Sequence, residues 1–168
     1  MTKPIALGHK VKDIATGITG IAISRCEFLT GNVQWTVQPK SEKAGAFIEP
    51  MSFDELQLDY VDDGISGRVT PAPLSTGIVL GECVEDIVSK IKAIAVRCVT
   101  YMNGCVYYSL QTEKTTKDES AEYHIEYKRL KVVSKGVVAE IAKRNEADQS
   151  TPGARPTGGP AMRPMKRG

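Results

Sequence analysis

The sequence lacks several features that assign a function directly. It has no apolar run long enough to span a bilayer, and its first residues hold no apolar segment typical of a secretory signal peptide. We therefore expect a protein that stays in the cytoplasm where it is made and makes no membrane contact. The net charge of +2 is too small to indicate a nucleic-acid partner by itself.

Histidine and cysteine are scarce and poorly spaced for metal chemistry. The chain has two histidines, His9 and His124, and four cysteines without a C-x-x-C pair. Nucleophilic catalysis needs a base that is oriented by a third group, and no Ser, Cys and His set recurs with such a spacing. The sequence therefore predicts no metal site, no cofactor and no catalytic residues, and it predicts that both histidines lie on the surface.

What the sequence does contain is an internal repeat. Residues 7–38 align without a gap with residues 80–111, and 11 of the 32 positions are identical. Average residue usage predicts roughly two identities by chance, so a tandem duplication explains the match. The identical pairs are Leu7/Leu80, Gly8/Gly81, Val11/Val84, Asp13/Asp86, Ile14/Ile87, Ile18/Ile91, Ile21/Ile94, Ala22/Ala95, Gly31/Gly104, Val33/Val106 and Gln38/Gln111.

Alternation of apolar and polar residues within each copy is typical of β-strands. Val33, Trp35 and Val37 alternate with polar residues and therefore share one face of a strand. Similar patterns, bounded by turn residues, recur in both copies. The sequence predicts strands over residues 10–13, 18–28, 32–38 and 53–61, and over residues 84–87, 91–102, 105–111 and 125–133.

The strongest hairpin signal is Asn103-Gly104, because both residues tolerate a positive φ. A two-residue turn at this point pairs Cys98 with Ser109 across the hairpin. In that register Cys105 is not opposite Cys98, so a disulfide between them is disfavoured.

Five short strands in about 60 residues have the size and pattern of a small SH3-like β-barrel. We predict an all-β fold of two such barrels in tandem, followed by a short C-terminal helix and an extended basic arm. The expected domains are residues 6–62 and 79–135, with a linker at 63–78 and the helix and arm at 136–168. One continuous sandwich built from both copies is the alternative.

Positions shared by the copies favour structural roles. Asp13 and Asp86 each precede a turn, which favours turn caps that accept backbone N–H bonds over catalytic carboxylates. Trp35 corresponds to Tyr108 in an alternating strand, so core packing explains both better than base stacking does. Tyr107 lies on the opposite face and is the better candidate for a partner contact.

The cysteines differ when the copies are compared. Cys26 corresponds to Val99 and is expected to behave as a small core hydrophobe. Cys83, Cys98 and Cys105 correspond to polar residues of the first copy, which indicates partial exposure. Two interpretations are open: free thiols without a role, or thiols that contact or bond to a neighbouring subunit.

Charge is unevenly distributed between the copies. The end of the first copy is acidic, whereas the second copy has a modest basic bias. Opposite polarity favours head-to-tail contacts between copies or subunits. The acidic residues are Asp54, Glu55, Asp59, Asp62 and Asp63, and the basic ones are Lys90, Lys92, Arg97, Lys128, Arg129 and Lys131.

From residue 150 onward the chain contains four prolines, four glycines and only basic charges. Such a segment cannot build a core, and arms of this kind order when they bind a neighbouring subunit. The sequence therefore predicts an oligomeric protein whose arm contacts its partners. The expected partner contacts are Arg155, Arg163, Lys166, Arg167 and Tyr107.

The pattern LG-x-x-V-x-D-x-x-TG-x-x-G-x-A in residues 7–22, with a Gln-rich return strand and Phe53-Asp54-Glu55, resembles small SH3-like domains from tailed-bacteriophage genomes. The resemblance covers residues 7–61, and the second copy departs from it, with Ser89-Lys90 in place of Thr16-Gly17. It implies a non-enzymatic virion protein that decorates or reinforces the head, or belongs to the neck or tail.

The partners that this resemblance implies are other virion proteins, such as the major capsid protein or neck and tail proteins. The alternative is a nucleic-acid-binding or regulatory adaptor built on barrels of the KOW or Tudor type, although nucleic acid is the less expected partner. An enzyme is a third option, for which the sequence implies no substrate.

Overall fold

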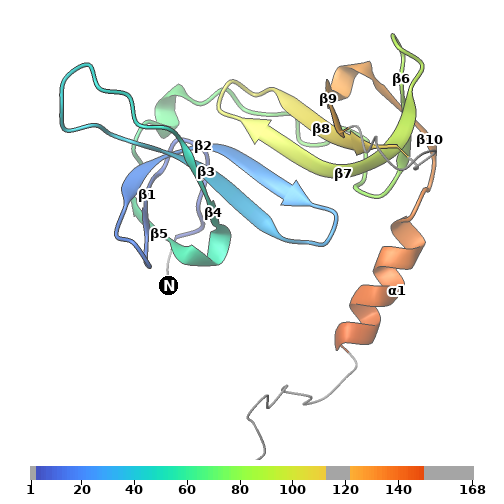
Figure 1. Ribbon diagram of the computed structural model, residues 1–168, viewed down its shortest axis with the longest axis horizontal. Helices are drawn as coiled ribbons and strands as arrows, with labels where there is room; N and C mark the ends of the chain where they lie inside the picture. Colours follow the sequence, from blue (N-terminus) through green and yellow to red (C-terminus); the bar gives the residue numbers. More distant parts are fainter. Residues whose placement is uncertain (1–2, 113–121, 150–168) are drawn as a thin grey trace, which may run out of the picture.

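The computed structural model describes residues 3–112 and 122–149, and these form a mostly β fold (Figure 1). Among these residues, ten strands pair antiparallel in one large sheet, and one α-helix, α1 (Val138–Gln149), follows them. The predicted antiparallel β fold and the short C-terminal helix are therefore confirmed.

The two copies contribute five strands each, in the same order. A 3-10 helix separates the last two strands of each copy, and a further one, η2 (Ser66–Arg68), lies in the linker. The first copy contains β1 (Lys10–Asp13), β2 (Thr19–Phe28), β3 (Val33–Pro39), β4 (Met51–Asp54), η1 (Glu55–Gln57) and β5 (Leu58–Asp62). The second contains β6 (Cys83–Asp86), β7 (Lys92–Tyr101), β8 (Val106–Gln111), β9 (Glu122–Glu126), η3 (Tyr127–Arg129) and β10 (Leu130–Ser134).

The internal repeat is visible in the strand pairing. β1 lies between β2 and β5, and β6 lies between β7 and β10 in the same way. The ladder between β2 and β3 has a bulge between Ala22 and Ser24, and the ladder between β7 and β8 has one between Ala95 and Arg97. Even this irregularity therefore recurs at the offset that aligns the two sequences.

The copies are joined by antiparallel pairing of β2 with β7. Cys26 lies opposite Val99, its own counterpart in the other copy, so the junction has a local two-fold arrangement. The Leu29 amide donates to β7 at 2.8 Å, and its counterpart, the Met102 amide, donates to β2 at 3.3 Å. The result is one continuous sheet, and no pairing among the described strands closes either copy into a barrel.

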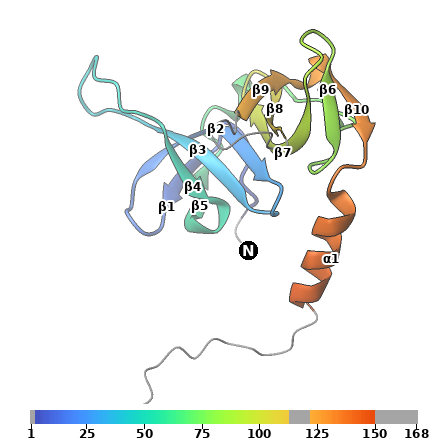
Figure 2. The same ribbon diagram turned by 45° about the vertical axis from the view of Figure 1, so that its right-hand side comes forward.

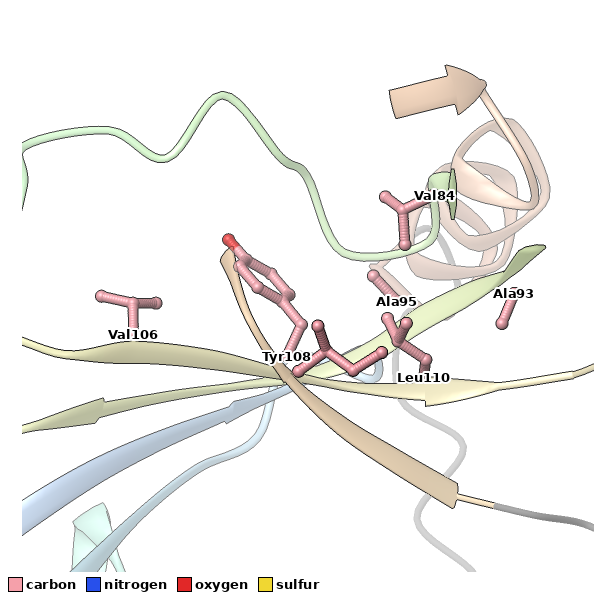
Figure 3. Close-up of a cluster of buried hydrophobic side chains, with 7 residues drawn as sticks. Val84, Ala93, Ala95, Val106, Tyr108 and Leu110 are labelled. Carbon is pink, nitrogen blue, oxygen red and sulfur yellow. The ribbon is translucent and has the colours of Figure 1, made fainter. Parts of the chain in front are cut away.

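Each copy nevertheless has its own hydrophobic core. In the first copy, Trp35 is 2% exposed and packs among residues from β1, β2, β3 and β5. In the second copy, Tyr108 takes the equivalent place, and Figure 3 shows it beside Leu110 and Ala95. Burial raises the pKa of Tyr108, and its hydroxyl donates to the Ile78 carbonyl at 3.1 Å. The prediction that both aromatic side chains are core residues is therefore confirmed.

The closing strand predicted at residues 53–61 is wrong in one respect, and so is its counterpart at 125–133. Each is two strands separated by a 3-10 helix, which interrupts the alternation. Leu56 lies in this turn and is 94% exposed, although alternation assigns it to the core face.

The predicted two-residue turn at Asn103-Gly104 is also wrong. Gly104 has φ +80°, but Asn103 does not have the positive φ that a two-residue turn of this kind requires at both positions. The turn is therefore one residue longer: the Tyr101 amide donates to the Cys105 carbonyl at 3.0 Å. Cys98 consequently lies opposite Tyr108.

Two segments extend beyond the body of the molecule. The loop between β3 and β4, residues 40–50, reaches away from the sheet in both views, and α1 stands clear of the strands (Figures 1 and 2). By contrast, residues 70–78 of the linker follow the second copy. The Thr70 amide donates to the Met102 carbonyl at 2.8 Å, and Ala72 and Ile78 pack against the second core.

Candidate functional site

Asp13 and Asp86 both cap the turn that follows the first strand of their copy. The amide and hydroxyl of Thr16 donate to Asp13 Oδ2 at 2.7 and 2.5 Å, and those of Ser89 donate to Asp86 Oδ2 at 3.0 and 2.7 Å. The Thr16 hydroxyl holds the pKa of Asp13 below its usual range. The geometry is that of the predicted turn cap, and the two carboxylates lie in different copies.

A difference between these two caps was missed in the sequence. In the second copy, Arg129 donates from Nε and Nη2 to the two oxygens of Asp86, at 3.1 and 2.7 Å. This guanidinium, followed by Ser89, holds the pKa of Asp86 well below its usual range. The first copy has Gln57 in place of Arg129, and Asp13 Oδ1 is buried without a hydrogen-bond partner among the described residues. Comparing Gln57 with Arg129 is the sequence signal that identifies this difference.

Replacing Gln57 with arginine should therefore raise the melting temperature by a few degrees, because the new guanidinium can reproduce the two bonds of Arg129. The gain requires an ionised Asp13 whose pKa is lowered in the folded state. It should be full at pH 7 and disappear as the pH falls from about 4 through that lowered pKa. Calorimetry at both pH values measures the effect.

The matched control is Arg129→Gln, which removes the bidentate pair from the second copy and should lower the melting temperature at pH 7. If Gln57→Arg leaves the melting temperature unchanged while Arg129→Gln lowers it, the two caps are not equivalent and the interpretation is wrong.

The prediction that His9 lies on the surface is wrong, because the side chain is buried. Its Nδ1 accepts a hydrogen bond from the Ala6 amide at 3.1 Å, and its ring meets that of Tyr60 edge-on at 5.0 Å. Its counterpart Glu82 accepts from the Val79 amide at 2.9 Å, so both residues cap the same loop. A side chain that accepts a hydrogen bond is what this position requires, which explains the exchange of His for Glu.

His124 is exposed, as predicted, and belongs to a polar row across β7, β8 and β9. Its Nδ1 lies 2.9 Å from Ser109 Oγ, and the Arg97 guanidinium bonds to both Ser109 and Glu122, at 2.9 and 2.8 Å. The contact resembles that of a nucleophile with its base. Ser109 is fully buried, however, so its hydroxyl is not presented to a substrate.

Of the residues predicted to contact a partner, the structure brings Tyr107 and Cys105 together. Both line a hollow of about 380 Å³ with Tyr101, Asn103 and His124, and the Tyr101 and Tyr107 rings meet edge-on at 5.9 Å. An amphipathic aromatic pair at the surface is suited to protein contacts. Tyr107 is thus placed where a partner can reach it.

All four cysteines are free thiols, in three kinds of surroundings. Cys26 is buried, as predicted, and burial raises its pKa to about 11. Cys98 packs against the second core, and burial raises its pKa as well. Because the thiolate is the reactive form, Cys98 is poorly suited to bonding with a neighbour. Cys83 and Cys105 are partly exposed and lie on different elements.

The charge asymmetry persists once ion pairs are considered. In the second copy, Arg97, Lys128 and Arg129 each pair with a carboxylate of their own copy. In the first copy, Asp54 and Glu55 pair with no basic residue among those that the structure describes. An unneutralised acidic surface thus remains at the start of η1.

The predicted contacts Arg155, Arg163, Lys166 and Arg167 lie outside the described residues. Within residues 3–112 and 122–149, no three His, Cys, Asp or Glu side chains are grouped to hold a metal ion. None of the helices in this part of the chain is both long and apolar enough to cross a membrane. Comparison with protein-family models, curated proteins and solved structures found no match.

Proposed function

We propose that this chain is a non-enzymatic structural protein of a tailed bacteriophage, built from two SH3-like five-stranded copies that remain open along one edge, and a basic C-terminal arm. It decorates or reinforces the head, or belongs to the neck or tail, and it works through contacts with other virion proteins. The observation that carries the proposal is the joining of two copies into one sheet by β2 and β7. This junction holds two related but differently charged surfaces at a fixed spacing, which suits a protein that binds two neighbours at once.

The SH3-like part of the proposal rests on the arrangement within each copy. Five short antiparallel strands surround one small core, and the first strand bridges the second and the fifth. Core residues of the first copy come from four of the five strands, so the sheet bends over them. The virion assignment rests on the resemblance in residues 7–61 and on the composition of the arm.

Deleting residues 150–168 tests this function. The truncated protein should fold, because every described strand and α1 precede the deletion. Its occupancy in particles should fall to less than about a tenth of that of the full chain, since several charge-assisted contacts are lost together. Quantitative mass spectrometry of purified particles from the virus that encodes the chain measures this occupancy.

A full-length control separates charge from length. It replaces every basic residue of the arm with glutamine, and it should reproduce the loss if charge carries the contact. Full occupancy of the truncated protein would contradict the role of the arm, and absence of the full chain from particles would contradict the virion assignment. Salt-dependent retention on DNA would instead favour the nucleic-acid adaptor.

A further inference from the structure

A hollow on the first copy matches the chemistry of the C-terminal arm. Its volume is about 520 Å³, within the range of pockets that bind ligands. The β2–β3 hairpin forms one side, and the end of β4 with η1 forms the other. It combines an exposed apolar rim at Leu56 with two carboxylates, and its main lining residues are Gly31, Val33, Asp54, Glu55, Leu56 and Gln57.

The two carboxylates of this hollow are hydrogen-bonded, but no basic side chain of the described residues pairs with them. Asp54 accepts from Gln34 Nε2 at 3.0 Å, and Glu55 accepts from Trp35 Nε1 at 3.3 Å. These bonds fix the carboxylates in place and leave each of them an oxygen for another donor. In the second copy, the corresponding glutamate pairs with Lys128, so only the first copy presents free negative charge here.

The second copy shows what lies beside the equivalent hairpin glycine. There the linker lies against the hairpin: a side chain on Gly104 would meet the Pro71 carbonyl at 3.0 Å and Thr70 at 3.2 Å. Gly31 is the counterpart of Gly104, and no other described atom lies within 4 Å of a side chain built there. The fold therefore accommodates a proline-containing segment at this position, and in the first copy the position is open.

We propose that the arm of a second copy of this chain, residues 150–168, binds in the hollow of the first. The arm carries four basic residues and no acidic ones, which complements Asp54 and Glu55. Its methionines suit the apolar rim at Leu56. The arm follows α1, which stands clear of its own sheet in both views, so α1 ends where a neighbouring chain can approach it (Figures 1 and 2).

This contact is heterologous, because the arm of one chain meets the hollow of another. Passed on from chain to chain, contacts of this kind build rings or open chains, whereas two chains that exchange arms form a closed dimer. The inference rests on the proposed function, since it names the surface through which the arm connects subunits.

Photo-cross-linking of the purified full-length protein tests the proposal. A photoreactive residue replaces Met162, and unlabelled protein is mixed with nitrogen-15-labelled protein so that links between chains are distinguished from links within one. We expect links between chains that end in residues 31–33 and 54–57. The double variant Asp54→Asn, Glu55→Gln should reduce their yield about tenfold. The matched control is Glu126→Gln, which changes the counterpart of Asp54 in the second copy and should leave the yield of links between chains unchanged.

A charge exchange makes the test specific. Asp54→Lys with Glu55→Lys should abolish the links, and mixing this variant with an Arg163→Glu, Arg167→Glu partner should restore them. Links that form only within one chain, end elsewhere, or ignore these substitutions would overturn the proposal. Because the links are measured on purified protein, that failure is distinct from absence of the chain from particles, which overturns the proposed function.

Discussion

Replacing Trp35 with alanine should lower the free energy of unfolding by about 3–5 kcal/mol. The indole is 2% exposed, and its removal leaves a cavity that the surrounding strands cannot fill by small shifts. It also removes the Nε1 bond to Glu55 and the ring beneath the Arg25 guanidinium, which lies 5.8 Å from the ring centroid. The neighbours that would line this cavity are Val11, Ala22, Val37 and Leu58.

Urea denaturation followed by circular dichroism measures the loss. Intrinsic tryptophan fluorescence is unsuitable because Trp35 is the only tryptophan of the chain. The matched control is Gln34→Ala, one residue earlier on the opposite face of β3, and it should cost less than about 1 kcal/mol. A Trp35→Ala variant as stable as that control would mean that the first copy does not have the core described above.

The internal repeat is what made most of the fold predictable. Alternation in residues 32–38 identifies Trp35 and Val37 as core residues, and alignment transfers the assignment to Tyr108 and Leu110. The first strand was predicted at residues 10–13 and is observed there. These predictions succeed because strand alternation is set by local geometry and because two aligned copies provide two independent tests of each position.

Features that depend on non-local packing were not predictable in the same way. The stretch that contains Leu56 alternates like a strand, yet a 3-10 helix interrupts it in both copies. The burial of His9 depends on contacts with Tyr60 and Ala6, which no periodicity indicates. The pairing of β2 with β7 could not be predicted from the sequence either, because the residues of an edge strand do not indicate which other strand will pair with it.

The hollow beside η1 illustrates the same limit. The sequence identified Asp54 and Glu55 as part of an acidic cluster, but not that they lack ion-pair partners. That distinction requires knowing where each lysine and arginine folds. Asp63 of the same cluster lies 2.5 Å from Lys3 Nζ, whereas Asp54 has no such partner among the described residues. Proximity in the sequence therefore did not separate the neutralised carboxylates from the free ones.

Replacing Gly136 with alanine should lower the free energy of unfolding by about 3 kcal/mol or more. Gly136 has φ +51°, and a side chain there would collide with the Gly81 carbonyl oxygen and lie 2.8 Å from the Cys83 amide nitrogen. The Val137 amide donates to that same carbonyl at 2.8 Å, so the chain cannot move away without losing the bond. Strain and collision therefore add together, and the connection between β10 and α1 should loosen.

The first copy repeats this arrangement and provides a second test. Gly64 has φ +49°, a side chain there would collide with the Gly8 carbonyl oxygen, and the Ile65 amide donates to that oxygen at 2.8 Å. Gly64→Ala should therefore cost as much as Gly136→Ala. The matched control is Gly77→Ala: its φ of +74° is equally left-handed, but no atom of the other described residues lies within 4 Å of the added atom. It should cost only about 1–2 kcal/mol, the strain of the left-handed conformation alone. Urea denaturation measures the three losses of unfolding free energy. Equal losses would mean that left-handed strain alone causes them, and that Gly64 and Gly136 do not pack tightly against the carbonyls of Gly8 and Gly81.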